Sequence, residues 1–105
     1  MNNNFLKIIP LGGLGEIGLN MMVYEYRNTI LIVDAGLMFP ESYMLGIDIV
    51  IPDITYLKEK KSSISGIVLT HCHEDHVGAI PFVLKEIRCP IYGTPFTLNF
   101  VRNKL

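Results

Sequence analysis

An apolar segment that ends in a cluster of histidines constrains this chain more than any other feature. The segment ISGIVLT (64–70) has the composition of a buried strand, and HCHEDH (71–76) follows it with all three histidines of the 105-residue chain. The next segment, AIPFVLKEI (79–87), predicts a helix with Pro81 tolerated in its first turn. A strand followed by a helix indicates an α/β fold, in which functional sites lie at the carboxyl ends of strands.

The N-terminal third of the chain predicts three further strands. The segments 5–11, 20–26 and 29–36 are apolar and partly β-branched, and Arg27-Asn28 forms a short polar turn. Residues 37–53 contain two prolines and a glycine, which predicts an ordered loop. The remaining segments predict a short helix, a short strand and a C-terminal helix at 54–63, 90–93 and 94–105.

Composition excludes several classes of protein. Half of the residues are apolar, which is rich for so short a chain and suggests part of a larger fold. No apolar run is long enough to span a membrane, and the polar start lacks the features of a signal peptide, so we expect a cytoplasmic protein without a membrane partner. The net charge of −1 gives no basic field for nucleic acid, and LKEKK (57–61) predicts a solvated helix face. Cys72 and Cys89 are expected to be reduced thiols.

The histidine cluster has the spacing of metal ligands. His71 and His73 alternate as residues of an extended segment do, so both imidazoles can face one metal ion. Asp75 and His76 follow where the chain turns into a helix, and they can face a second ion nearby. This ligand set suits zinc, with manganese as an alternative. The competing interpretation is a histidine-rich surface turn without metal.

Four side chains do not complete two metal shells, because one zinc ion alone takes about four ligands. Either the chain binds metal weakly or further ligands lie beyond Leu105. We therefore expect the chain by itself to bind zinc poorly and to lack hydrolase activity. Within the cluster, Glu74 is expected to face solvent or cap the helix, and Cys72 to serve packing.

Three aspartates outside the cluster have two interpretations each. Asp34 closes a predicted strand, and its carboxylate can either fix the tautomer of a metal-binding histidine or close the turn after the strand. Asp48 and Asp53 can bind a hard cation through their oxygens, but their spacing and the nearby proline fit turn chemistry as well.

The segment PLGGLGEIGLN (10–20) has the G-x-G-x-x-G spacing of a dinucleotide-binding loop, from Gly13 to Gly18. Such a loop requires a helix directly after the glycines, and here the next segment predicts a strand. We therefore interpret it as a loop joining the first two strands. It is expected to lie at the same rim as the metal ligands, with Glu16 and Asn20 as its polar residues.

These residues resemble a known family. His71, His73, Asp75 and His76 match the H-x-H-x-D-H motif of the metallo-β-lactamase fold, and Asp34 in DAG matches its first-motif aspartate. The strings PLGGLGEIGLNM, VDAGLMFPE, MLGIDIVIPDITYL, GIVLTHCHEDHVGAIPFVL and PIYGTPFTL are similar, in order and spacing, to the N-terminal part of ribonuclease J, a β-CASP nuclease.

The resemblance implies that residues 1–105 form the N-terminal half of a metallo-β-lactamase αββα sandwich, a mixed sheet with helices on its outer face. The β-CASP and C-terminal domains would be absent from this chain. The family's activity is that of a zinc-dependent ribonuclease, a 5'-to-3' exonuclease and endonuclease in RNA decay and maturation. A metal-bound hydroxide attacks the RNA phosphorus in this family.

By the same resemblance, His71 and His73 would hold one zinc, and Asp75 and His76 the other, which makes Asp75 and His76 catalytic. The parent protein is expected to bind RNA and to form homo-oligomers. Separately from the resemblance, the hard-cation interpretation of Asp48 and Asp53 leaves a structural Ca²⁺ in the parent as a hypothesis. Two positions depart from the family pattern: Cys72 replaces a usual glycine, and Leu19 a frequent lysine. The alternatives are another hydrolase of this fold, such as a thioesterase, or a non-catalytic remnant.

Overall fold

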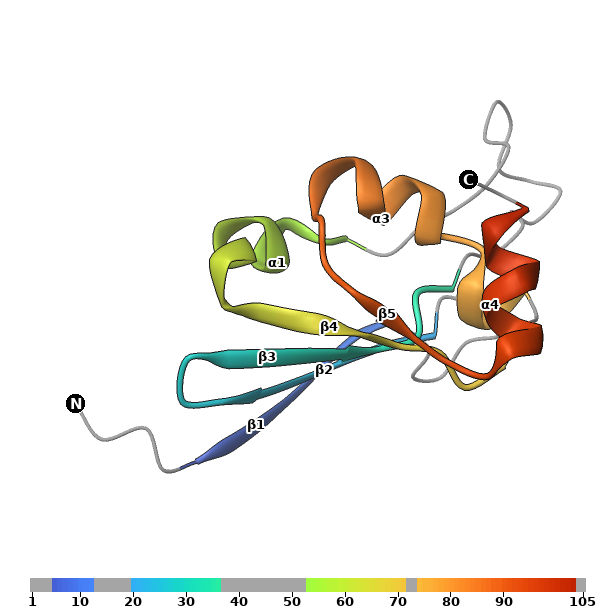
Figure 1. Ribbon diagram of the computed structural model, residues 1–105. Coiled ribbons are helices and arrows are strands. Elements are labelled where there is room, and N and C mark those ends of the chain that lie inside the picture. The colour runs from blue at the N-terminus through green and yellow to red at the C-terminus, as the bar shows by residue number, and fades with distance from the viewer. Residues whose placement is uncertain (1–4, 13–19, 37–52, 72–73, 104–105) are drawn as a thin grey trace, which may run out of the picture.

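A mixed β-sheet forms the centre of the computed structural model, which describes residues 5–12, 20–36, 53–71 and 74–103 (Figure 1). Within these ranges the strands follow one another in chain order across the sheet. β1 pairs antiparallel with β2, and β2 with β3, whereas β3–β4 and β4–β5 are parallel. The strands are β1 (Leu6–Gly12), β2 (Met21–Tyr26), β3 (Thr29–Val33), β4 (Ile64–Val68) and β5 (Ile91–Tyr92).

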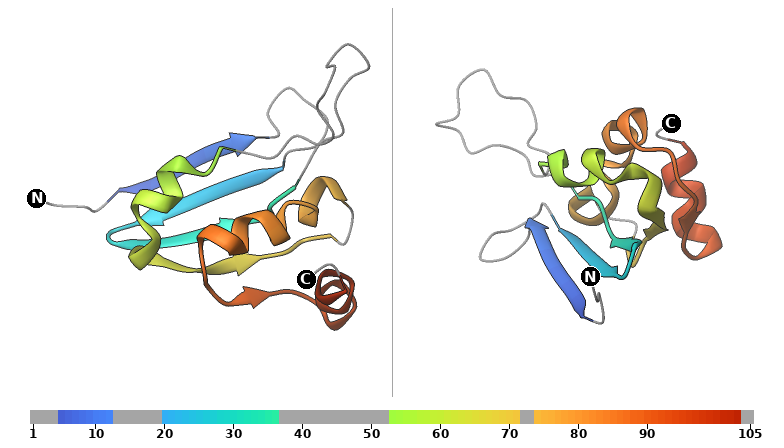
Figure 2. Two further views of the ribbon diagram at one scale, coloured as in Figure 1. Left: turned by 90° about the horizontal axis from the view of Figure 1, so that it is seen from above. Right: turned by 90° about the vertical axis from the view of Figure 1, so that its left-hand side faces the viewer.

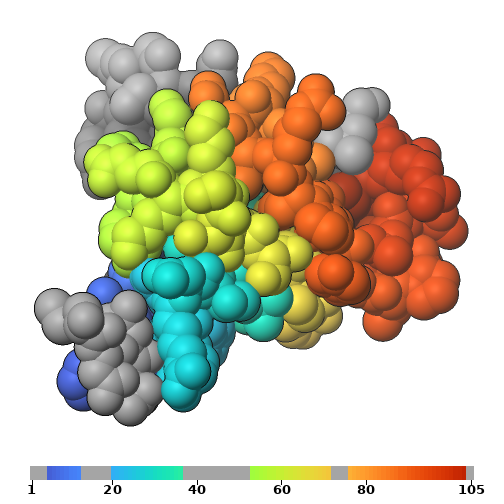
Figure 3. Space-filling view, turned by 60° about the vertical axis from the view of Figure 1, so that its left-hand side comes forward, coloured from blue at the N-terminus to red at the C-terminus, as the bar shows by residue number. Residues whose placement is uncertain are grey.

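The helices gather on one side of this sheet (Figures 1 and 2). α1 and α3 lie side by side over it in the space-filling view (Figure 3), and α4 lies beyond the end of β5. The mixed sheet with helices on its outer face, predicted from the sequence, is thereby confirmed. The helices are α1 (Thr55–Glu59) with the 3-10 turn Lys61–Ser63, α2 (Glu74–Val77), α3 (Ile80–Glu86) and α4 (Pro95–Arg102).

Local sequence explains where several elements begin. Pro81 stands in the first turn of α3, where a missing N–H is tolerated. Thr94 is the N-cap of α4 and accepts a hydrogen bond from the Thr97 N–H at 3.2 Å. β2 begins directly after Asn20, so a strand and not a helix follows the glycine-rich segment, as predicted.

None of the described helices is long and apolar enough to cross a membrane.

The core lies between the sheet and the helical layer. Alternate residues of β2 and β3 are buried on this side, because successive side chains of a strand point to opposite faces. They pack against side chains of α1 and α3. The fully buried members of this cluster include Val23, Ile30, Ile32, Leu57, Ile67, Ile80 and Ile87.

The other face of the sheet is apolar and largely exposed. Leu6 pairs with Tyr26 across β1 and β2, and these two residues, Ile8 and Tyr92 are all more than 40% exposed. Exposed apolar side chains arranged in this way are typical of a sheet that forms one layer of a sandwich. The arrangement agrees with the half-sandwich implied by the resemblance.

One polar side chain interrupts the buried face. Glu25 of β2 is only 7% exposed, and its carboxylate accepts hydrogen bonds from the Tyr56 hydroxyl and from Lys60 Nζ, the latter at 2.9 Å. The Tyr56 hydrogen bond is the largest effect that lowers the pKa of Glu25, and Lys60 lowers it further. The predicted solvated face at 57–61 is confirmed for Lys58, Glu59 and Lys61, which are exposed. Lys60 is partly exposed while it pairs with Glu25, and Leu57 is buried in the core.

Replacement of Gly66 by alanine should destabilise the fold by about 1–3 kcal/mol, because the sheet is closely packed there. A methyl group at this position would lie 2.6 Å from Tyr92 Cε2 and 3.0 Å from the Pro90 carbonyl oxygen. Gly93→Ala is the matched control, since its nearest contact is an ordinary 3.5 Å. Urea unfolding of the two variants checks the difference, and equal midpoints would contradict it.

Glu25→Gln should destabilise the chain by about 1 kcal/mol at pH 7, since it removes a hydrogen-bonded charge. The pKa of Glu25 is lowered from its ordinary value of 4.5. The ionised carboxylate therefore stabilises the fold fully at pH values above this ordinary pKa. The effect is lost as pH falls through the lower, folded-state pKa. Urea unfolding at several pH values should show the two proteins converging in acid.

Glu86→Gln is the control for this prediction. Glu86 pairs with Lys58 at 3.8 Å, and both side chains are about half exposed. An exposed pair of this kind contributes little, so the variant should match the wild-type chain within about 0.5 kcal/mol. A loss as large as that of Glu25→Gln would show that burial is not the cause.

Candidate metal centre

The parallel pairing of β3 and β4 brings two polar residues together at one edge of the sheet. Val33 lies opposite Val68 in the register. The Asp34 N–H donates to the Val68 carbonyl at 2.8 Å, which extends the pairing by one residue. The Thr70 N–H then donates to Asp34 Oδ1, also at 2.8 Å. Asp34 and Thr70 are thereby held side by side where their strands end.

The Asp34 carboxylate is the centre of the polar contacts at this edge. The residue is 5% exposed and has a positive φ of 65°, a conformation that aspartate tolerates better than most residues. Its Oδ2 accepts a hydrogen bond from Thr70 Oγ1 at 2.7 Å and lies 2.9 Å from His76 Nδ1. One buried carboxylate therefore contacts both the end of β4 and a histidine of α2.

Backbone hydrogen bonds fix α2 against the end of β3. The Ala35 N–H donates to the His76 carbonyl at 2.8 Å, and the Ala79 N–H donates to the Ala35 carbonyl at the same distance. The Gly36 N–H donates to the Asn20 carbonyl at 2.9 Å. The position of His76 is thus set by the main chain as well as by the contact of its ring with Asp34.

His71 joins the same cluster through Thr70. Its Nδ1 lies 3.0 Å from Thr70 Oγ1, while His76 Nδ1 lies 3.4 Å from the same oxygen. The two imidazole rings have centroids 4.5 Å apart and planes inclined by 44°. The structure therefore brings together three of the residues singled out from the sequence, Asp34, His71 and His76.

Other predicted site residues lie outside what the structure describes. His73, Cys72, Glu16 and Asp48 fall outside the described residues, and Asp75 is described only as backbone within α2. Among the side chains that are described, no group of three or more His, Cys, Asp and Glu could hold a metal ion. The assignment of His71, His73, Asp75 and His76 as metal ligands therefore stays a prediction.

The ends of the glycine-rich segment lie at the same edge. A pocket of about 200 Å³ is lined by Gly12, Asn20, Asp34 and His76, among others. The sequence predicted this loop at the rim of the site, and the structure places its Asn20 end there.

Cys89, the other predicted reduced cysteine, is a free thiol whose pKa is raised by burial.

Asp53 forms a turn rather than a cluster with other carboxylates in the described part of the chain. Its Oδ1 accepts hydrogen bonds from the Thr55 N–H at 3.0 Å and the Thr55 hydroxyl at 2.7 Å. These hydrogen bonds lower the pKa of Asp53. The contacts support the turn interpretation at the start of α1.

Thr70 is the site residue that sequence reasoning missed. It contacts Asp34, His71 and His76. A threonine at a strand end gives no strong signal by itself, since β-branched residues are common in strands. Its place directly before the first histidine was the available clue.

Comparisons with known proteins identify the fold and its relatives. A sequence model of the Metallo-beta-lactamase superfamily matches residues 14–104. The chain is 52% identical over 99 residues to Ribonuclease J of Helicobacter pylori, a match covering 94% of this chain and 14% of that protein. It is 48% identical over 103 residues to Ribonuclease J 2 of Staphylococcus aureus, covering 98% of this chain and 18% of the relative.

The solved structure of human tRNase Z, short form (ELAC1), is similar in fold, with a TM-score of 0.53 at 18% identity. That match covers 94% of this chain and 38% of the human one. The chain thus spans less than a fifth of the two ribonuclease J relatives, which it matches along nearly its own whole length. By these matches and by its fold, the chain belongs to the metallo-beta-lactamase superfamily and is a homologue of ribonuclease J.

Proposed function

We propose that this chain supplies part of the dinuclear zinc centre of a ribonuclease that hydrolyses RNA phosphodiester bonds. His71, His73, Asp75 and His76 are the proposed metal ligands, with Asp34 supporting them. The observation that carries this proposal is the contact of the buried Asp34 carboxylate with His76, at 2.9 Å, beside a second imidazole. A carboxylate that holds an imidazole in place is a common support of metal-binding histidines.

The residues present fit a zinc ion. A carboxylate oxygen accepts hydrogen bonds, so in the neutral imidazole of His76 the proton is on Nδ1 and points to Asp34. Nε2 is then the nitrogen that carries a lone pair for a metal. Imidazole and carboxylate ligands suit zinc, and manganese is the alternative.

The metal and the chain would have separate tasks in the reaction. Two bound zinc ions would lower the pKa of a water molecule and share the charge of an in-line displacement at phosphorus. The chain would hold its ligands at the end of the sheet, with Asp34 keeping the proton of neutral His76 on Nδ1. Asp75 and His76 are the residues of this chain that we place closest to the reaction.

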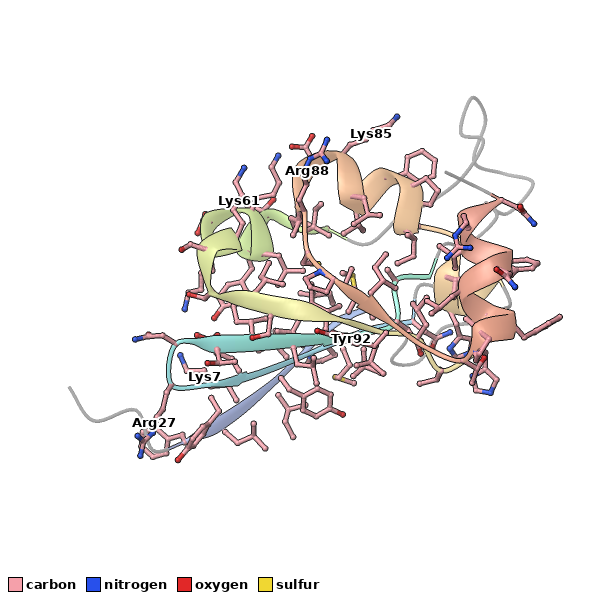
Figure 4. The ribbon with its side chains drawn as sticks, in the orientation of Figure 1. Lys7, Arg27, Lys61, Lys85, Arg88 and Tyr92 are labelled. Atoms are coloured by element: carbon pink, nitrogen blue, oxygen red, sulfur yellow. The ribbon has the colours of Figure 1, made fainter. Side chains whose placement is uncertain are left out.

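RNA as the substrate rests on the ribonuclease J relatives. The basic side chains labelled in Figure 4 are spread over two regions of the chain, so we propose that the main contacts with RNA lie on other parts of the longer protein. Lys61, Lys85 and Arg88 project from the helical layer, and Lys7 and Arg27 lie at the end of the sheet away from α4. We further propose that the longer protein is a cytoplasmic homo-oligomer with both exonuclease and endonuclease activity, whose partner is RNA.

In the longer ribonuclease, Asp75→Ala should abolish RNA cleavage while leaving the fold intact. Loss of a supporting partner of a metal ligand costs about 10- to 100-fold, so loss of the ligand should cost more. Glu59→Gln, at an exposed position of α1, is the control and should cleave RNA normally. Cleavage of a 5'-labelled RNA measures the effect, and wild-type turnover by Asp75→Ala would contradict the role.

The chain of residues 1–105 should bind zinc weakly and should not hydrolyse RNA. Its four proposed ligands do not complete two zinc shells. A competition titration against a chromophoric chelator measures the affinity. Tight stoichiometric binding that is lost in His71→Ala would overturn the expectation.

A further inference from the structure

We propose that Thr70 is a positioning residue that links the Asp34 carboxylate to His71 through a relay of two hydrogen bonds. Asp34 would then determine which ring nitrogen carries the proton in both histidines, in His76 directly and in His71 through Thr70. The proposal rests on the function proposed above. It concerns a residue that the sequence pattern did not single out, and it follows from the placement of protons among four side chains.

The first step is the proton between Thr70 and Asp34. The Thr70 hydroxyl oxygen and Asp34 Oδ2 are 2.7 Å apart. Two oxygens at this distance require a proton between them, and an ionised carboxylate has none to give. Thr70 therefore donates its only hydroxyl proton to Asp34.

The second step is the contact between Thr70 and His71. Because the hydroxyl proton is committed to Asp34, Thr70 Oγ1 can only accept from His71 Nδ1, which lies 3.0 Å away. Nδ1 of His71 must then carry a proton. In the neutral ring this leaves the lone pair on Nε2, the same arrangement that Asp34 imposes directly on His76.

The third step is the rigidity of the relay. Asp34 contacts Thr70 twice, through the backbone N–H to Oδ1 at 2.8 Å and through the hydroxyl to Oδ2. This two-point contact, together with the restricted χ1 of a β-branched residue, holds the hydroxyl in one position. Thr70 is exposed, whereas the carboxylate that orients it is buried. The buried charge can thus direct a histidine at the surface.

The relay has a chemical consequence. Neutral histidine in water favours the proton on Nε2, so removal of the Thr70 acceptor should move the tautomer equilibrium of His71 toward the form protonated on Nε2. A protonated Nε2 cannot bind a metal. The hydroxyl should therefore raise the affinity of the site by keeping His71 ready to bind through Nε2.

The direct test is the tautomer of each histidine in its neutral form, measured by long-range ¹H–¹⁵N NMR on the metal-free chain along a pH series that is extended until the ring ¹⁵N shifts no longer change. In the wild-type chain both His71 and His76 should carry the proton on Nδ1. In Thr70→Val, which keeps the shape but lacks the hydroxyl, His71 should shift toward the Nε2-protonated form while His76 keeps its tautomer.

Two further variants complete the experiment. Thr70→Ser retains the hydroxyl and should keep the wild-type tautomers. Thr29→Val removes a hydroxyl from an exposed residue at the far end of β3 and should change neither histidine. Thermal unfolding of each variant checks the fold. Should Thr70→Val fail to fold, the tautomer of His71 in the wild-type and Thr70→Ser chains decides.

Zinc affinity of the longer ribonuclease gives a second measurement. Thr70→Val should weaken zinc binding by about 10- to 100-fold, and Thr70→Ser should restore it. An Nε2-protonated His71 in the wild-type chain, or a zinc affinity that Thr70→Val leaves unchanged, overturns the proposal. Absence of RNA cleavage by the zinc-loaded longer protein would count against the proposed function but would leave the tautomer result standing.

Discussion

The parallel pairing of β3 with β4 is the contact on which the candidate metal centre depends. It ends both strands at the same edge of the sheet, so that Asp34 and Thr70 meet just after Val33 and Val68 have paired. Because side chains alternate along a strand, a shift of one residue in this register would turn Asp34 to the other face. His71 follows Thr70 directly in the chain, so both histidine contacts depend on the same alignment.

The backbone of Asp34 adopts an unfavourable conformation, which the hydrogen bonds at this end of the sheet stabilise. A positive φ at a residue other than glycine costs about 1–2 kcal/mol. Arg27 has a positive φ as well, but it lies in the two-residue turn of the β2–β3 hairpin, where such values are expected. Asp34 lies in no such turn. Its conformation is offset by hydrogen bonds from its own N–H to Val68 and from Thr70 to its carboxylate.

Much of the fold could be predicted because the relevant signals are local. The apolar, partly β-branched composition of 20–26 predicted β2, and Pro81 was correctly placed in the first turn of a helix. The glycine motif misleads only when it is considered without the segment that follows it. The charged residues of 57–61 were predicted to form a solvated helix face, but nothing local showed that Lys60 would also pair with Glu25 of β2.

The sequence by itself determined the chemistry: the histidines and carboxylates, their spacing, and their place after a strand. These follow from residue type and from the short-range periodicity of strands and helices. Only the tertiary structure decided which of these groups touch. Asp34 reaches Thr70 across 36 positions and His76 across 42, and such contacts depend on strand register and on how α2 packs. The role of Thr70 was likewise decided by the tertiary structure. Whether its hydroxyl donates or accepts a hydrogen bond depends on Asp34 and His71, which the fold places beside it.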